Sequence, residues 1–435
     1  MCSGKGIVPR CVFRYNTIRF AVGLQPERKA GNMQIQAGRK RGAYLLLGAA
    51  ALAFAGVIYA WSILKAPLAE AFGWTGTALT LNYTLTMTFY CIGGFLGGLF
   101  GKRLGCRVCL LAAAILSGAG FFLASRLQGS SIVPLYLFYG FMAGLGIGLA
   151  YNVIISTVSA WFPDKKGFCS GALMMSFGVS ALLTGKLAGF LIDGPGWRTA
   201  YLVIGGALVI TLTATALGLR LPPKDWKAPD AQQKKRIRSA PEAEEYTAGQ
   251  MLRRVSFWLA FFCVVCMAAV GNTAFSFARD LALSVGAGPD AAVTLVGVLS
   301  VCNGLGRILV GVVYDRAGRK ATMLAANGLT IAAAGVTLLA VWLRSLPLCV
   351  AGLCLIGLSY GAPPTISSAL VREFYGAKHF QMNFAVMNFT LLFAAGIATV
   401  AGSLLEATGA FLAPLLLLLT LSLVSLLLDL CIRKP

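Results

Sequence analysis

The chain has very little of one catalytic residue type: His379 is its only histidine in 435 residues. A single histidine excludes the His-Glu-x-x-His metal helix, His-rich metal sites and the Ser-His-Asp triad. The sequence therefore predicts no catalytic residues, no bound metal and no cofactor. We expect a protein that is not an enzyme.

Charged residues are also scarce. They make up 12% of the chain, hydrophobic residues make up 58%, and the mean hydropathy is +0.78. A soluble protein of this length carries about twice that charged fraction. Twelve cysteines are present, most of them inside apolar runs, where they pack as small hydrophobic residues rather than form disulfides. This composition indicates an integral membrane protein.

Acidic residues are missing from the middle of every apolar run. They stand near the ends of the runs or in loops, as at Asp193, Asp280, Asp290, Glu373, Glu406 and Asp429. A proton-coupled symporter usually needs a titratable acid inside the membrane. The lack of one favours anion exchange or facilitated diffusion, although a proton carried on the substrate itself stays an open alternative.

No apolar segment of the kind found in a cleavable signal peptide precedes Tyr44. Residues 1–41 are basic and polar, which predicts a cytoplasmic tail. Met33 begins a more ordinary N-terminus for a membrane protein, and we expect it to be the true start of translation.

The apolar runs form two sets of six. Residues 221–255 separate the two sets with a Pro-rich, charged linker that has no core-forming pattern. We expect six-helix bundles over residues 42–220 and 256–431, followed by a short tail at 432–435. The expected spans are 42–64, 79–101, 108–125, 133–158, 168–191, 199–220, 256–279, 290–313, 321–342, 346–370, 380–403 and 411–431.

The net charge of +22 does not indicate a nucleic-acid partner, because the basic residues lie in loops between the apolar runs. Thirty of the 37 lysines and arginines fall in the two tails and the even-numbered loops, and five fall in the odd-numbered loops. Lys186 and Arg307 lie within spans. The positive-inside rule therefore places both termini in the cytoplasm of a multi-pass protein of the cytoplasmic (inner) membrane.

Arg307 is the most informative residue in the chain. It stands eight residues before Asp315, which marks the end of its apolar run, so it lies about 12 Å deeper in the membrane. Asn303 is four residues away on the same helix face. A guanidinium at this depth is costly and predicts a binding site for an anion. The alternative is a structural arginine that caps a helix end or pairs with a buried acid.

A loop motif follows Arg307, and a degenerate copy lies 213 positions earlier. The offset also superposes Gly144 on Gly357 and Gly148 on Gly361. The motif resembles the loop between helices 8 and 9 of the major facilitator transporters. That resemblance implies twelve transmembrane helices in two bundles related by a parallel repeat. The residues that carry it, with expected roles in gating, are Gly311, Asp315, Arg316, Gly318 and Arg319, and in the first copy Gly98, Arg103 and Gly105.

Other stretches resemble the branch that contains the oxalate:formate antiporters and the related monocarboxylate transporters. They are Val57–Trp61, Gly144–Tyr151, Met251–Trp258, Asn303–Arg307 and Ser359–Tyr360. This resemblance implies that Tyr59, Tyr151 and Tyr360 line the substrate cavity and that Arg307 faces the carboxylate. The alternative for each tyrosine is simple core packing.

The chain departs from oxalate carriers in its eleventh helix. The resemblance leads us to expect a second cation there, a lysine, but that position is Leu391, with Asn388 one turn before it. One guanidinium balances one carboxylate, whereas a dianion in the same cavity is poorly compensated. This favours formate, lactate or pyruvate over oxalate. Lys186 is an alternative second cation, although its place near a span end favours snorkelling to the interface.

The sequence therefore predicts an all-α secondary transporter that exchanges small organic monocarboxylates by alternating access. Its substrate-binding residues are expected to be Arg307, Tyr59, Tyr151, Tyr360, Asn303 and Asn388. Oxalate or dicarboxylate antiport and efflux of a larger anion remain alternatives, as does a non-transporting membrane sensor. The expected partners are the carboxylate and the lipid bilayer, and we expect a monomer.

Overall fold

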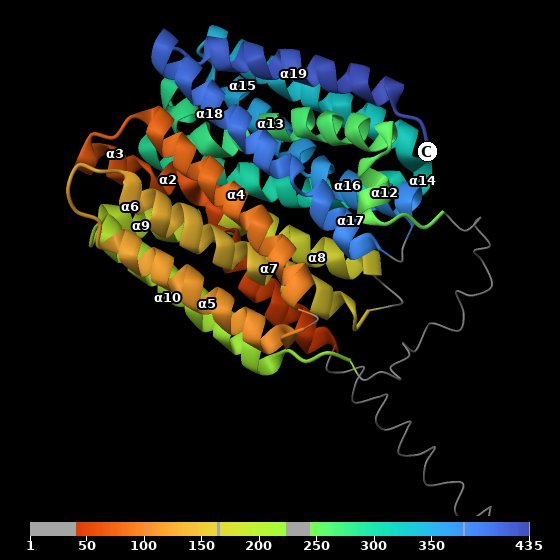
Figure 1. Ribbon diagram of the computed structural model, residues 1–435. Helices are drawn as coiled ribbons and strands as arrows, with labels where there is room; N and C mark the ends of the chain where they lie inside the picture. The colour runs from red at the N-terminus through yellow and green to blue at the C-terminus, as the bar shows by residue number, and fades with distance from the viewer. Residues whose placement is uncertain (1–40, 102, 163–165, 223–243, 377–378, 435) are drawn as a thin grey trace, which may run out of the picture.

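The computed structural model describes residues 41–101, 103–162, 166–222, 244–376 and 379–434. The expected start at Met33, the tail before residue 41 and residues 223–243 of the linker lie outside these ranges. All regular secondary structure in the described part is helical (Figure 1). The helices run side by side (Figure 1). Many of their apolar side chains are exposed, such as Ile115, Ile210 and Leu427. This surface fits a lipid bilayer.

The first six spans form the N-terminal bundle. They are Arg41–Leu64, which ends in η1 (Gly56–Ala60) and α2 (Trp61–Leu64); α4 (Gly76–Phe100); α5 (Gly105–Ser125); α6, η2 and α7 (Val133–Leu135, Tyr136–Ala143, Gly144–Ser159); α8 and α9 (Lys166–Gly178, Ser180–Asp193); and α10 (Trp197–Gly218). A short helix, α3 (Ala66–Phe72), connects the first two spans.

The second set of spans forms the C-terminal bundle, preceded by the short helix α12 (Ala248–Leu252). Its helices are α13 (Val255–Ser284), α14 (Pro289–Trp342), α15 and α16 (Leu346–Tyr360, Ala362–Tyr375), α17 and α18 (Phe380–Met387, Thr390–Thr408), and α19 (Leu412–Cys431). The C-terminus and α12 lie at one end of the molecule, which we call the terminal side. The opposite end, which carries α3, is the distal side (Figure 1).

α14 contains two spans rather than one. It has 54 residues, which is about 80 Å of helix, far more than the roughly 30 Å hydrocarbon core of a membrane. Gly318 interrupts it with φ 73° and ψ −180°. Eleven described stretches are long and apolar enough to span, and the division of α14 makes twelve spans. The predicted number of spans is therefore confirmed.

The predicted repeat offset is visible in helix packing. A methyl group added at Gly144 would lie 2.7 Å from the carbonyl oxygen of Thr86, and one added at Gly357 would lie 2.5 Å from that of Leu299. Both residues of the first pair lie 213 positions before those of the second. α7 therefore packs on α4 as α15 packs on α14, with backbone against backbone.

The same offset relates two further close contacts. A methyl group at Gly93 would lie 2.2 Å from the carbonyl oxygen of Leu145, and one at Gly306 would lie 2.2 Å from that of Leu358. Gly93→Ala should therefore destabilise the protein by about 1–3 kcal/mol, because two backbones must separate. Gly206→Ala is the matched control, since a methyl there meets nothing within 4 Å. Melting temperatures in detergent test this expectation, and equal values for the two variants would contradict it.

Both copies of the loop motif place a glycine in the left-handed region, with φ 73° at Gly318 and 82° at Gly105. A basic side chain after each glycine reaches the end of the last helix of its own bundle. Arg107 donates to the carbonyl oxygens of Ala216 and Leu217 in α10, each at 3.4 Å, and Arg319 donates to Ile432 after α19 at 3.4 Å. These contacts satisfy carbonyl groups at helix C-termini.

The other residues of the loop motif are exposed or half-buried. Asp315, Arg316 and Arg103 are exposed, and Gly98 and Gly311 are half-buried. A methyl group at Gly311 would make only an ordinary 3.7 Å contact with Thr365. The expected gating roles of these residues stay predictions.

Candidate functional site

Arg307 lies between the two bundles, with its side chain reaching from α14 into the N-terminal half. It is 5% exposed. Its Nη1 donates to the carbonyl oxygen of Met174 in α8 at 2.7 Å, and its Nη2 donates to the hydroxyl of Tyr59 in η1 at 3.3 Å. Among the described residues no carboxylate lies within ion-pair distance of this guanidinium. A buried positive charge without an acid is unfavourable until an anion joins it.

Unused hydrogen-bonding groups surround this charge. Arg307 Nε is buried and has no partner in the described structure, and neither Nδ2 nor Oδ1 of Asn303, one turn away, has one. Asn303 is fully buried. Buried donors without partners are rare in folded proteins and cost about 1–3 kcal/mol each. The free Nε–H and the free amide are therefore candidate hydrogen-bonding groups for a small polar anion.

Aromatic rings enclose this site. The Tyr59 ring centroid lies 5.4 Å from that of Phe177 and 4.5 Å from that of Phe275. Tyr151 lies 4.9 Å from Phe177 and 5.4 Å from Tyr90. Two of the predicted tyrosines, Tyr59 and Tyr151, therefore lie in one cluster that joins α4, α7, α8 and α13. These rings belong to the surroundings of the Tyr59 hydroxyl, which accepts from Arg307, and a charge interacts more strongly in such a buried place than in water.

Tyr360 belongs to the same cluster, but its hydroxyl is already engaged. Its ring lies 6.1 Å from that of Tyr59, and its hydroxyl donates to Asn272 Oδ1 at 2.8 Å. The Tyr83 hydroxyl donates to the same oxygen at 3.0 Å. In this conformation Tyr360 shapes the wall of the site rather than offering a free donor.

Helix interruptions coincide with the site. Tyr59 lies in the 3₁₀ turn η1, Tyr360 is the last residue of α15, and Asn388 follows the end of α17. Pro363 and Pro364 follow Tyr360, and they cannot continue the hydrogen-bond pattern of α15. Discontinuous helices at the midplane are a common way for transporters to build binding sites. Three of the predicted site residues, Tyr59, Tyr360 and Asn388, therefore lie where the backbone is irregular. Arg307, Asn303 and Tyr151 instead lie within continuous stretches of helix.

Asn388 is placed differently from the other predicted residues. It is half-buried, and its carbonyl oxygen accepts from Cys91 Sγ at 3.4 Å. No hydrogen bond in the described part of the structure joins its side chain to Arg307, so its expected role stays a prediction. Leu391 is half-buried, and its carbonyl oxygen accepts from Asn272 Nδ2 at 3.4 Å.

Two lysines lie on the distal side of the site. Lys186 is exposed and donates to Thr294 Oγ1 across the bundles, in keeping with a residue at a span end. Lys65 is the buried one: its Nζ lies 2.8 Å from Asp280 Oδ2 and 4.3 Å from the Phe277 ring centroid. Sequence reasoning placed Lys65 in a loop and did not identify this pair.

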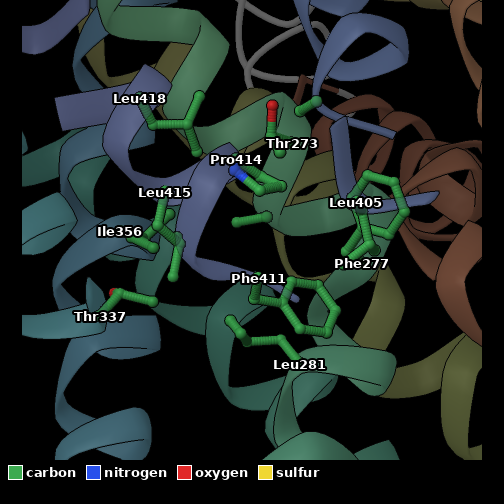
Figure 2. Close-up of a pocket in the computed structure, with 12 residues that line it drawn as sticks. Thr273, Phe277, Leu281, Thr337, Ile356, Leu405, Phe411, Pro414, Leu415 and Leu418 are labelled. Carbon is green, nitrogen blue, oxygen red and sulfur yellow. The ribbon is translucent and has the colours of Figure 1, made fainter. Parts of the chain in front are cut away.

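A separate apolar cavity lies within the C-terminal bundle (Figure 2). Phe277, Leu281, Ile356, Phe411 and Leu415 line it, and its only polar side chains are Thr273 and Thr337. It offers no charge to a carboxylate. The candidate site is therefore the cluster around Arg307 and not this cavity.

Comparisons with known proteins agree with this architecture. The family model for the Major Facilitator Superfamily matches residues 46–399. The oxalate:formate antiporter of Oxalobacter formigenes is 26% identical over 79% of this chain and 80% of its own length. Monocarboxylate transporter 12 of Rattus norvegicus is 26% identical over 76% of this chain and 72% of its own.

A solved structure shares the fold. The crystal structure of a bacterial homologue of the human lysosomal transporter Spinster superposes with a TM-score of 0.64 at 16% identity. The match covers 90% of this chain and 96% of that one. The family model matches most of the sequence, and the fold has the twelve spans and the repeated helix packing described above. This chain therefore belongs to the major facilitator superfamily.

Proposed function

We propose that the protein transports small organic monocarboxylates by binding their carboxylate at Arg307. The observation that carries this proposal is a buried guanidinium that faces no acid in the described structure and keeps a free Nε–H. A carboxylate would neutralise the charge and accept the unused hydrogen bonds. Two relatives, named as an oxalate:formate antiporter and a monocarboxylate transporter, support the same class of substrate.

The charge balance of the site favours a monoanion. Lys65 is neutralised by Asp280, Lys186 is exposed, and Leu391 carries no charge. The site around Arg307 therefore has about one net positive charge. A second carboxylate without a partner would cost several kcal/mol there, which is a factor of hundreds in affinity.

The same balance favours exchange. The carrier alternates between a conformation open to one side of the membrane and one open to the other. When the site is empty, this conformational change must carry an uncompensated guanidinium through the low-dielectric centre of the protein. When the site is occupied, the moving unit is neutral and its desolvation penalty is smaller. The occupied carrier should therefore cross between states faster than the empty one. We place the terminal side in the cytoplasm, from the distribution of lysine and arginine.

Counterflow into proteoliposomes tests the proposal. Formate, lactate and pyruvate should each compete with a labelled monocarboxylate at least a hundredfold better than oxalate at neutral pH, by the charge argument above. Lactamide, which has the shape of lactate without its charge, is the matched control and should not compete. Preference for oxalate over every monocarboxylate would contradict the monoanion, and uptake of no carboxylate at all would overturn the proposed function.

A further inference from the structure

Asn272 is a polar residue in the middle of the apolar helix α13, and it is fully buried. Its Oδ1 accepts hydrogen bonds from Tyr83 at 3.0 Å and from Tyr360 at 2.8 Å, and its Nδ2 donates to the Leu391 carbonyl oxygen at 3.4 Å. Two hydroxyl donors fill the two lone pairs of the amide oxygen. One side chain therefore joins four helices, α4, α13, α15 and α18.

The two tyrosine contacts differ in kind. Tyr360 and Asn272 belong to the same bundle, so their bond remains when the bundles move relative to each other. Tyr83 belongs to the N-terminal bundle, so its bond to Asn272 joins the two halves. Beside it, Thr84 Oγ1 donates to the Ala395 carbonyl oxygen at 2.6 Å, which is also a contact between bundles.

The Tyr83–Asn272 bond depends on the distal side being closed. The Lys65–Asp280 pair and the hydrogen bond from the Thr77 N–H to Glu406 Oε1 close that side in this conformation. If the distal ends separate, Tyr83 loses Asn272 and its hydroxyl meets water instead. The bond therefore adds stability to the distal-closed state alone.

Resting on the proposed function, we infer that Asn272 is a positioning residue with two separable tasks. Through Tyr360 it holds the ring that packs against Tyr59, the residue that accepts from Arg307, and so it sets the shape of the carboxylate site. Through Tyr83 it favours the distal-closed state. Neither task requires Asn272 to touch the substrate.

Two conservative variants separate these tasks. Tyr360→Phe should raise the carboxylate concentration that gives half-maximal exchange about three- to tenfold, the typical effect of one hydrogen bond, and should leave the distal side closed. Tyr83→Phe should shift the equilibrium toward the distal-open state by a similar factor. Hydrogen–deuterium exchange of substrate-free protein should then be faster at the distal ends of α4 and α13. Asn272→Leu should show both effects.

Tyr139→Phe is the matched control, because the Tyr139 hydroxyl is equally buried but has no partner in the described structure. It should change neither readout. Adding Tyr83→Phe to Asn272→Leu should give no further increase in distal exchange, because the bond is already lost. If Asn272→Leu is not recovered as folded protein, the two Tyr→Phe variants carry the test.

The outcomes distinguish this inference from the proposed function. Distal hydrogen exchange is measured without substrate, so wild-type protein that moves no carboxylate overturns the proposed function and leaves the Tyr83 result standing. Wild-type protein that exchanges carboxylate, with a Tyr83→Phe variant that matches Tyr139→Phe in distal exchange, overturns the inference. If Tyr360→Phe leaves the carboxylate concentration for half-maximal exchange unchanged, Asn272 does not shape the carboxylate site through Tyr360.

Discussion

Arg307→Gln should lower carboxylate exchange by at least a hundredfold while the protein still folds and inserts. The variant loses the counter-charge of the substrate and its charge-assisted hydrogen bonds, each worth about 1.5–3 kcal/mol. Folding should be kept, because glutamine retains an amide donor and removes an unpaired buried charge. Counterflow of labelled lactate in proteoliposomes measures the loss, and the amount of folded protein in detergent checks recovery.

Two further variants sharpen this test. Arg307→Lys should also exchange poorly, since a compact ammonium does not reproduce the planar fork of donors. Arg126→Gln removes the same charge from a position over the Phe122 ring, away from the site, and should exchange at the wild-type rate. If Arg307→Gln exchanges as well as Arg126→Gln, Arg307 does not bind the substrate.

The second large effect concerns the distal ion pair, whose two partners differ in exposure. The Lys65 side chain is 6% exposed and that of Asp280 is 35% exposed. Asp280→Asn leaves a buried ammonium unpaired and should destabilise the closed protein by about 3 kcal/mol. Lys65→Met leaves a carboxylate that water can reach, so its cost should stay below about 1 kcal/mol. Melting temperatures in detergent should therefore fall much further for Asp280→Asn.

The double variant Lys65→Met/Asp280→Asn serves as the control for this pair. With both charges removed, its melting temperature should return close to that of Lys65→Met. Equal losses in the two single variants would mean that Lys65 reaches water. A double variant as unstable as Asp280→Asn would show that the aspartate acts through something other than the pair.

Much of the fold was predictable because membrane insertion imposes strong patterns on a sequence. The twelve apolar runs, the division at Gly318 and the repeat at an offset of 213 all follow from spans, loops and small residues. Arg307 was identifiable because a charge inside a span is rare. These signals are local, so one sequence is enough to detect them.

The rest of the site depends on contacts that no local pattern encodes. Asn272 is a single polar residue in an apolar span, which is a usable signal, but its partners come from three other helices. Lys65 and Asp280 stand near span ends, where solvated charges are expected, and only the packing of the two bundles buries the lysine. The 3₁₀ turn at Tyr59 likewise has no marker in its sequence.

The glycine contacts have a consequence for how such a molecule must move. Where α4 touches α7 and α14 touches α15, main chain lies directly on main chain, without flexible side chains between them to absorb sliding or rotation. We therefore expect each of these helix pairs to move as a rigid body. A large displacement is then expected between the two bundles, at the interface that holds Arg307 and its aromatic cluster, rather than within these helix pairs. If these helix pairs move as rigid bodies, a small shift between the bundles should reach both faces of the membrane, and opening one face should close the other.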